Sequence, residues 1–396
     1  MAIVTTDIDG QPRNASKPDI GADEGSFLIS TKDTLAPVIL FTALPNTSST
    51  ANPTLVVTIT DMGDKVDTTT FKPRLWYKKS NNANTWLPAG QNTSAYDGWK
   101  WVNPINNSSP FTFVIDYSLL AGGIPVPGQV IQYFVAAQDY HVNPNLAVYP
   151  VTGGYTATNV SNFSVTPSTY YSYKILKTLS GDYLVGAAQP APFNTLNNAF
   201  SRLDSSEITG SVRFLLTDAT YNLNGMITIN PITGASATRT FTLKPNTGVT
   251  SRIVGYHNGN ESVFRLIGAD YVTIDGSNTN GGTTRDLTIE DTAGYVTGKN
   301  GAVINIRSMG VGAGSKCVTI KNCILKGGQN KPYLSDVMGI LSGGQPFNNG
   351  DDNDSLVINN NLIYNLRFGI RISGNEAGIH NYVRVTNNTL DSLTRH

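Results

Sequence analysis

The sequence predicts an all-β chain in which an antiparallel β-sandwich is followed by a parallel β-helix. Three observations predict this fold class. Charged residues make up only 14% of the 396 residues while glycine is abundant, a composition that suits strands and turns better than helices. Between residues 33 and 172 apolar and polar residues alternate with a period of two. Towards the C-terminus one short strand pattern recurs.

Composition and charge exclude several classes of protein. The 28 basic and 28 acidic residues cancel, so no global field would attract nucleic acid or an anionic membrane surface. No stretch approaches the roughly 20 apolar residues of a membrane span. The two cysteines, Cys317 and Cys323, lie in one strand-like segment and cannot form a disulfide framework. Both are expected to be small packing residues.

Residues 33–172 contain short alternating strands with turns between them, the pattern of an antiparallel sandwich. All four tryptophans fall in this segment, and we expect two of them to fill its core rather than form a platform for sugar rings. The expected strands cover residues 38–43, 55–60, 74–78, 111–116 and 131–139.

From residue 174 onward the pattern changes, and the one convincing helix covers residues 194–205. Leu196, Ala199, Phe200 and Leu203 form a single apolar face, and Asn194 is expected to be the N-cap. Because the open end of a stacked β-structure exposes its core and its strand edge, we expect this helix to cover that end.

The recurring strands share the pattern apolar, any, apolar, any, Asn. Copies at 318–324, 356–362 and 383–389 place Asn322, Asn360 and Asn387 at the same point. Their spacings of 38 and 27 residues, with loops of variable length, indicate a solenoid. Degenerate copies with Gly or Asp in place of Asn lie at 271–276 and 286–291, and second strands lie at 302–306, 338–341 and 368–372.

These three asparagines have a structural explanation. Each coil of a β-helix turns a corner after its strand, and Asn tolerates the left-handed conformation that a tight corner requires. We expect stacked Asn side chains of successive coils to form a hydrogen-bonded ladder, while the alternating Val, Ile and Leu point inward.

Several motifs carry a resemblance to known proteins. Asp33-Thr-Leu-Ala-Pro37, Pro73-Arg-Leu-Trp-Tyr77 and the segment 128–139, together with Thr58-Ile-Thr-Asp-Met62, are similar to the immunoglobulin-like domains of large Bacteroidota surface proteins. The arrangement from Gly181 through the helix to Thr220-Tyr221 resembles the start of the right-handed, pectate-lyase-like β-helix of the same proteins.

The N-terminal segment resembles a further part of such proteins. Thr6-Asp-Ile-Asp-Gly-Gln-Pro-Arg13 and Pro18-Asp-Ile-Gly-Ala-Asp-Glu24 look like the segment that closes the C-terminal end of pectate-lyase-like β-helices. Arg13 with Asp19 or Glu24 is expected to be a structural pair that closes the coil rather than an active site. The expected order is therefore a remnant β-helix coil (1–30), an immunoglobulin-like sandwich (33–172) and the first part of a second β-helix (174–396). We expect the chain to be a window from a longer tandem array.

No catalytic or metal-binding motif stands out, and no catalytic residue or cofactor is assigned. The four histidines are scattered, and no metal-ligand spacing or nucleophile elbow is found. The best cation candidate is an acidic loop with Asp351, Asp352 and Asp354 as oxygen ligands for Ca²⁺. A solvated turn is the favoured alternative. Asp61, Asp64 and Asp139 form a second candidate set, for which turn capping is favoured.

Four arginines are expected to point outward from the coils. Arg307, Arg367, Arg371 and Arg384 would form a basic stripe that holds an acidic polysaccharide and, with the acidic loop, performs lyase chemistry. The alternative is that they are ordinary solvent-facing arginines, because no acidic pair keeps a fixed relation to them.

The resemblance implies export by the type IX route and display on a bacterial cell surface. The expected function is that of a structural or adhesive module, with cell-surface glycans, surface proteins or copies of itself as partners. A carbohydrate-active β-helix enzyme of the lyase or hydrolase kind and a passive stalk are the alternatives.

Overall fold

The computed structural model divides the chain into two compact units whose regular secondary structure is almost entirely β-strand. Unit 1 contains the chain up to Pro45 together with Ala51–Pro125 and Gln129–Tyr173; unit 2 contains Asn46–Thr50, Val126–Gly128 and the chain from Lys174 onward. The structure describes residues 5–13, 33–63, 65–141, 143–150, 153–256, 261–292, 301–328, 337–343, 352–376 and 378–393.

Unit 1 consists of two antiparallel sheets, which confirms the predicted alternating strands. The first sheet has the order β1 (Val38–Leu40), β2 (Thr54–Thr60) and β5 (Phe111–Val114). The second sheet has the order β4 (Lys100–Val102), β3 (Arg74–Lys79), β6 (Val130–Gln138) and β7 (Leu146–Tyr149). In this sheet β8 (Tyr171–Lys174) also pairs with β6.

Large aromatic side chains fill the core of unit 1. Trp76 and Trp99 are almost completely buried and pack around Phe134, with ring centroids 6.5 and 5.2 Å from it. Both indole N–H groups donate hydrogen bonds, to the Val160 carbonyl and the Thr166 hydroxyl. The expectation that two tryptophans belong to the core is confirmed.

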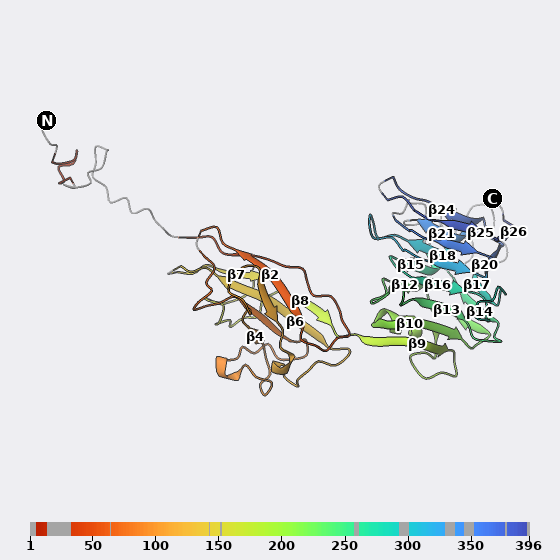
Figure 1. Cartoon of the computed structure of the whole chain (residues 1–396), viewed down its shortest axis with the longest axis horizontal. Helices are drawn as coiled ribbons and strands as arrows, with labels where there is room; N and C mark the ends of the chain where they lie inside the picture. The colour runs from red at the N-terminus through yellow and green to blue at the C-terminus, as the bar shows by residue number, and fades with distance from the viewer. Residues whose placement is uncertain are drawn as a thin grey trace. The chain divides into compact units, whose positions relative to one another are not determined.

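Unit 2 is a stack of coils whose described strands pair in parallel, and Figure 1 shows these strands lying one above another. We call its sheets A, B and C. Sheet A contains β9 (Lys177–Val185), β10 (Ser206–Leu216), β13 (Phe241–Pro245), β16 (Val272–Asp275), β19 (Thr319–Lys321), β22 (Val357–Asn359) and β25 (Arg384–Thr386).

Sheet B contains β11 (Thr220–Asn222), β14 (Ser251–Gly255), β17 (Leu287–Asp291), β20 (Cys323–Gly327), β23 (Leu362–Tyr364) and β26 (Thr389–Asp391). Sheet C contains β12 (Ile227–Ile229), β15 (Ser262–Ile267), β18 (Gly301–Arg307), β21 (Val337–Gly343) and β24 (Phe368–Ile372). Because each complete coil gives one strand to each sheet in turn, unit 2 is a parallel β-helix.

One prediction about the repeat needs correction. Residues 286–291 are not a further copy of the strand at 271–276. They form β17 of sheet B, which follows β16 of sheet A within the same coil. The predicted second strands are confirmed, since β18, β21 and β24 pair with one another in sheet C.

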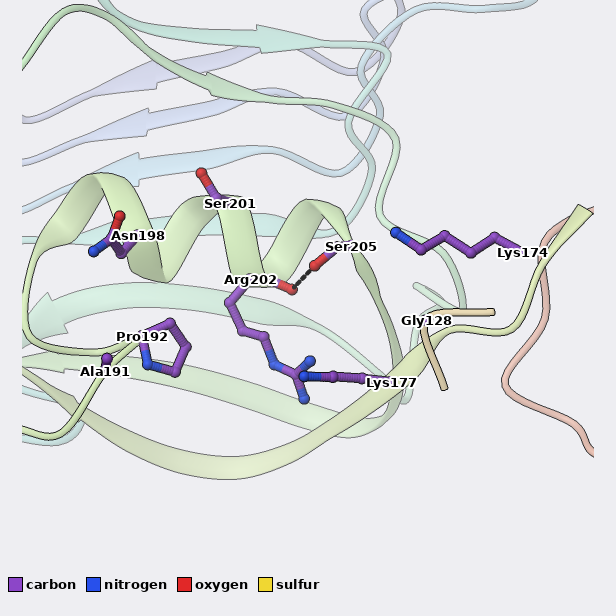
Figure 2. Close-up of a pocket in the computed structure, with 9 residues that line it drawn as sticks. All are labelled: Gly128, Lys174, Lys177, Ala191, Pro192, Asn198, Ser201, Arg202 and Ser205. Carbon is purple, nitrogen blue, oxygen red and sulfur yellow. Dashed lines mark hydrogen bonds between the residues drawn. The ribbon is translucent and has the colours of Figure 1, made fainter. Parts of the chain in front are cut away.

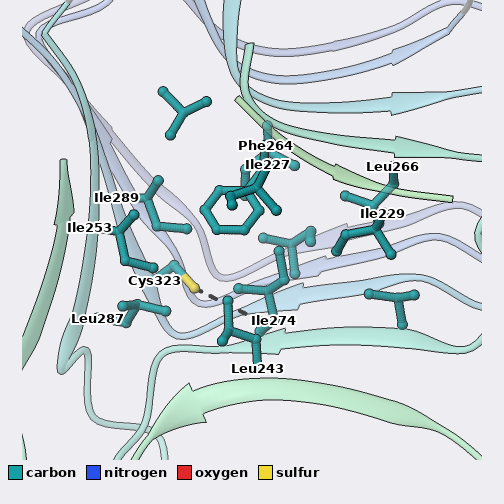
Figure 3. Packing of buried hydrophobic residues seen from close by; sticks show 14 of the residues in the cluster. Ile227, Ile229, Leu243, Ile253, Phe264, Leu266, Ile274, Leu287, Ile289 and Cys323 are labelled. Carbon is teal, nitrogen blue, oxygen red and sulfur yellow. Dashed lines mark hydrogen bonds between the residues drawn. The ribbon is translucent and has the colours of Figure 1, made fainter. Parts of the chain in front are cut away.

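The interior of the β-helix is filled by aliphatic side chains from all three sheets (Figure 3). Leu243 and Ile274 come from sheet A, Ile253 and Ile289 from sheet B, and Phe264 from sheet C; all are fully buried. Neighbouring strands in a sheet lie about 4.8 Å apart, so equivalent side chains of successive coils are in contact.

The helix α1 (Leu196–Asp204) is confirmed, and its apolar face joins the core of the β-helix. It contacts β9 and β10, the first two strands of sheet A, and β12, the first strand of sheet C. The predicted N-cap is wrong: Thr195 is extended, and its hydroxyl accepts a hydrogen bond from the Asn198 amide at 3.2 Å. Among the residues that the structure describes, no helix is long and apolar enough to cross a membrane.

Cysteine burial follows the prediction at one position only. Cys323 is buried in the interior, where burial raises the pKa of its thiol. Cys317 is exposed and left-handed, with φ of 57°, so it does not act as a packing residue. Both are free thiols.

The described N-terminal residues, 5–13, form a small hairpin. The Asp7 carboxylate accepts hydrogen bonds from the amides of Asp9 and Gln11, and the Arg13 amide donates to the Thr5 carbonyl. Glu24 and the rest of the predicted closing segment lie outside the described residues, so its pairing with Arg13 stays a prediction.

Candidate functional site

The predicted corner asparagines all stand at the exit of sheet A. Asn322, Asn360 and Asn387 directly follow β19, β22 and β25 and are left-handed, with φ of 58°, 54° and 56°. Gly276 holds the same place after β16. A Cβ there would lie 1.8 Å from the Asn322 carbonyl oxygen, so only glycine fits. The prediction that Asn turns these corners is confirmed.

The side-chain ladder at this corner connects three coils and then changes partner. Asn360 Nδ2 donates to Asn322 Oδ1 at 2.8 Å, and Asn322 Nδ2 donates to Asp275 Oδ1 at 2.7 Å. Asn387 instead donates to Asn359 Oδ1 at 3.1 Å. The predicted ladder is therefore correct for two of its three asparagines.

A second, more deeply buried row lies one residue further along, and the sequence prediction missed it. The Cys323 amide donates to Asn361 Oδ1 at 2.9 Å, and the Asn361 amide donates to Asn388 Oδ1 at 2.9 Å. Asn361 Nδ2 also donates to the Ile320 carbonyl at 3.0 Å. Asn360 and Asn387 are each followed by a second Asn. These Asn-Asn pairs are the sequence signal that could have revealed the row.

The loop between β16 and β17, residues 276–286, covers this corner. Arg285 Nε donates to the Asn360 carbonyl at 2.9 Å, and its Nη2 donates to Asn360 Oδ1 at 3.0 Å. In return, Asn322 and Asn360 donate to the carbonyls of Gly282 and Thr283. The loop thus fastens its own coil to the next two.

The acidic loop also connects coils. Asp352 Oδ2 accepts from the Gly312 amide at 2.5 Å, and Asp354 Oδ1 accepts from the Asn381 amide at 2.6 Å. Asp351 lies outside the described residues. Within the described ranges no group of three acidic, His or Cys residues is arranged to hold a metal ion. The carboxylates of Asp352 and Asp354 face different segments, and a Ca²⁺ site here stays a prediction.

The second acidic set acts in turns, where its position is described. Asp61 Oδ1 accepts from the Gly63 amide at 2.9 Å, and both Asp139 carboxylate oxygens accept hydrogen bonds from Asn145. Asp64 lies outside the described residues. The favoured interpretation, turn capping, is confirmed for Asp61 and Asp139.

The four predicted arginines do not form one stripe. Arg307 and Arg371 belong to sheet C but to different rows, because Arg307 pairs with Gly343 and Arg371 pairs with Leu341. Arg384 lies on sheet A. Arg367 precedes β24, with its guanidinium carbon 5.4 Å from the Phe368 ring centroid. The prediction put all four on one face, whereas they lie on two sheets and in the segment before β24.

Partial burial, and next the nearby cationic Arg265, lower the pKa of Arg307. Arg265 is itself paired with Glu261, with 3.1 Å between Nη1 and Oε2. Lyase chemistry by these arginines stays a prediction.

Charged side chains on the outer faces of sheets A and B are arranged in neutralising rows. On sheet B, Glu290 lies between Arg252 and Lys326, whose nitrogens are 2.5 and 3.3 Å from Oε2. On sheet A, Asp275 is 3.3 Å from Lys321 Nζ and also attracts Lys244, whose pKa burial lowers. These carboxylates have cationic partners, an arrangement that stabilises the stack.

The comparisons with known proteins give little. No family model and no curated protein matches the chain. Among solved structures it is similar to the Yersinia enterocolitica family 28 exopolygalacturonase, at 11% identity over 90% of this chain and 79% of that one, with a TM-score of 0.19. A TM-score of this size carries no argument, so the β-helix assignment rests on the strand pairing alone.

Proposed function

We propose that this chain is a structural and adhesive module of a large, repetitive bacterial surface protein. The observation that supports this most is the cross-linking of successive coils by side chains at the corner of sheets A and B. The side chains of Asn322, Asn361 and Arg285 form hydrogen bonds with neighbouring coils. Such side chains make a stiff stack, which suits a presenting scaffold better than a reaction site.

The organisation of the module is part of the same proposal. Unit 1 would be an immunoglobulin-like sandwich that acts as a spacer, and its two antiparallel sheets and aromatic core support this. Unit 2 would be the first part of a right-handed β-helix. Residues 1–30 would close a preceding β-helix, as their resemblance to such closing segments suggests.

The wider setting rests on the sequence resemblance. Export by the type IX route of Bacteroidota would place the protein outside the cell, where glycans, surface proteins or further copies of the same protein would be its partners. The near absence of net charge in the sequence supports partners recognised by local contacts rather than by a long-range field.

Binding without turnover is the property that tests this function. The purified chain is incubated with a panel of acidic and neutral polysaccharides, while unsaturated ends, reducing ends and bound polysaccharide are measured. We expect retention of at least one polysaccharide and no new chain ends. Release of either kind of end above a heat-denatured control would contradict the proposal and favour a carbohydrate-active enzyme. Retention of none would reduce the module to a passive stalk.

A further inference from the structure

A pocket of about 620 Å³ lies beside helix α1 in unit 2 (Figure 2). This volume falls within the range of about 300–1,000 Å³ that is usual for small-ligand sites. The Gly128 amide, which donates to the Ile175 carbonyl at 2.7 Å, holds one edge of the pocket to the strand region before β9. The lining residues are Gly128, Lys174, Lys177, Ala191, Pro192, Asn198, Ser201, Arg202 and Ser205.

The lining of this pocket carries three positive charges and no negative charge. Figure 2 shows the Arg202 side chain extending from α1 toward Lys177 of β9, with Lys174 further along the same segment. No described carboxylate pairs with any of the three, whereas Arg213 and Arg252 elsewhere on the β-helix have acidic partners. An unbalanced cationic cluster of this kind attracts an anion.

The end of helix α1 does not account for the position of Arg202. A basic side chain in the last turn often serves the unpaired carbonyls of a helix. Here the Arg202 carbonyl already accepts hydrogen bonds from the hydroxyls of Ser205 at 3.2 Å and Ser206 at 2.6 Å. The guanidinium group remains available to a ligand.

The other lining groups match a sugar. Asn198 and Ser201 offer amide and hydroxyl groups to sugar hydroxyls, the Ser205 hydroxyl oxygen can accept a hydrogen bond, and Pro192 offers an apolar surface to the C–H face of a pyranose ring.

We propose that this pocket binds an anionic sugar residue of an acidic glycan. The planar guanidinium of Arg202 can hold a carboxylate or sulfate through two parallel hydrogen bonds, while Lys177 and Lys174 add point charges. The inference deepens the adhesive role proposed above and rests on it, because it names the class of ligand and the place where that ligand binds.

The test is calorimetric titration of the full chain with three probes: a galacturonic acid trisaccharide, a heparin-derived tetrasaccharide and a neutral cellotriose. We expect binding of one or both acidic probes and none of the neutral probe. The difference between carboxylate and sulfate probes identifies the anion that the site prefers. The double substitution Lys177→Gln and Arg202→Gln should weaken binding by about tenfold or more, since two charge-assisted contacts are lost.

The matched control is Lys65→Gln with Lys72→Gln, which removes two positive charges from unit 1 and gives the same net charge. It should bind the acidic probe as the unsubstituted chain does. Equal weakening in both double variants would show diffuse charge attraction and overturn the proposal, as would failure of the unsubstituted chain to bind either acidic probe. Mass spectrometry of the recovered probe tests the proposed function separately from the pocket. Cleaved sugar would contradict the scaffold function, whereas the binding of the two double variants tests the pocket.

Discussion

The two units bury polar groups in different ways. In unit 1, individual side chains meet individual backbone groups: the fully buried Lys100 donates from Nζ to the carbonyls of Thr93 at 2.7 Å and Tyr96 at 2.5 Å. In unit 2, the buried Asn361 repeats a role that Asn388 plays one coil later. Unit 1 thus satisfies each buried polar group with a contact of its own, whereas unit 2 repeats the same hydrogen bond in successive coils.

This difference determines where stability is concentrated. Unit 1 depends on a few large aromatic side chains, such as Trp76, Trp99 and Phe134, which contact one another in a single cluster. Unit 2 spreads its core over many aliphatic residues from successive coils. Truncation of one large core side chain should therefore destabilise mainly the unit that contains it. The corner side chains should determine how strongly successive coils of unit 2 are held to one another.

The largest expected effect comes from core truncation. Phe134→Ala should destabilise unit 1 by about 3–5 kcal/mol because it leaves a cavity among the tryptophan rings. All four tryptophans lie in unit 1, so tryptophan fluorescence follows the denaturant unfolding of that unit alone. The matched change in unit 2 is Phe214→Ala, which should lower the far-ultraviolet circular dichroism transition and leave the fluorescence midpoint in place. A shift of the fluorescence midpoint by Phe214→Ala would mean that the units unfold together.

The next largest effect should be a loss of stability of unit 1 at alkaline pH, caused by its buried tyrosines. Burial raises the pKa of Tyr133 to about 12, and burial also raises those of Tyr77 and Tyr173. Below pH ~10 Tyr133 is protonated in the folded and unfolded states, and its contribution to the free energy of unfolding is fully present. Between pH ~10 and ~12 only the unfolded state loses the proton, so the free energy of unfolding falls by about 3 kcal/mol from Tyr133 alone.

The control for this prediction is Tyr133→Phe, which deletes the titrating phenol and its hydrogen bond from the Leu44 amide. The variant should be less stable at neutral pH by about 1 kcal/mol and should lose less stability above pH ~10. Comparing the two proteins cancels the buried Lys78 and Lys100, whose lowered pKa values act in the opposite direction. Parallel pH curves for the two proteins would refute the assigned role of Tyr133.

The corner row of unit 2 should show a smaller effect. Asn361→Ala leaves the Cys323 amide and the Ile320 carbonyl without their side-chain partner inside the stack and should cost about 2–3 kcal/mol. Asn387→Ala, at an exposed corner with one hydrogen bond, should cost about 1 kcal/mol. Circular dichroism unfolding curves measure both. Equal costs would argue against a buried ladder.

Surface ion pairs should matter least. Arg213 forms a two-pronged contact with Asp182, and both side chains are about 40% exposed. Arg213→Gln should therefore cost at most about 1 kcal/mol, and the difference should shrink as salt is added. A loss of stability that persists at high salt would show that this pair is worth more than an exposed ion pair.

Local patterns in the sequence predicted much of the fold. The period-two strands of unit 1, the apolar face of α1 and the left-handed Asn322, Asn360 and Asn387 follow from side-chain chemistry at each position. The division of residues 318–324 into two strands was missed because a single residue, Asn322, separates β19 from β20. A corner that short leaves no turn signal, so two strands look like one.

The candidate site was less predictable because its contacts are long-range. Arg285 reaches Asn360, 75 positions away in the sequence, through a loop whose path no local pattern specifies. The pocket beside α1 brings together Lys177 and Arg202 from different elements. Alternation along one strand says which side chains point outward but not which strands share a sheet, so the prediction put Arg384 of sheet A on one face with Arg307 and Arg371 of sheet C.

Native-state hydrogen exchange at the corner tests the central claim, that unit 2 is a stack stiffened by its corner side chains. Segments that open for ligands or catalysis come from the least stable parts of a protein. We predict that the Cys323 amide, which donates to Asn361 Oδ1, exchanges as slowly as the paired amides of β16 and β19. Exchange of the Cys323 amide at the rate of an exposed turn, such as that around Gly310, would contradict the claim.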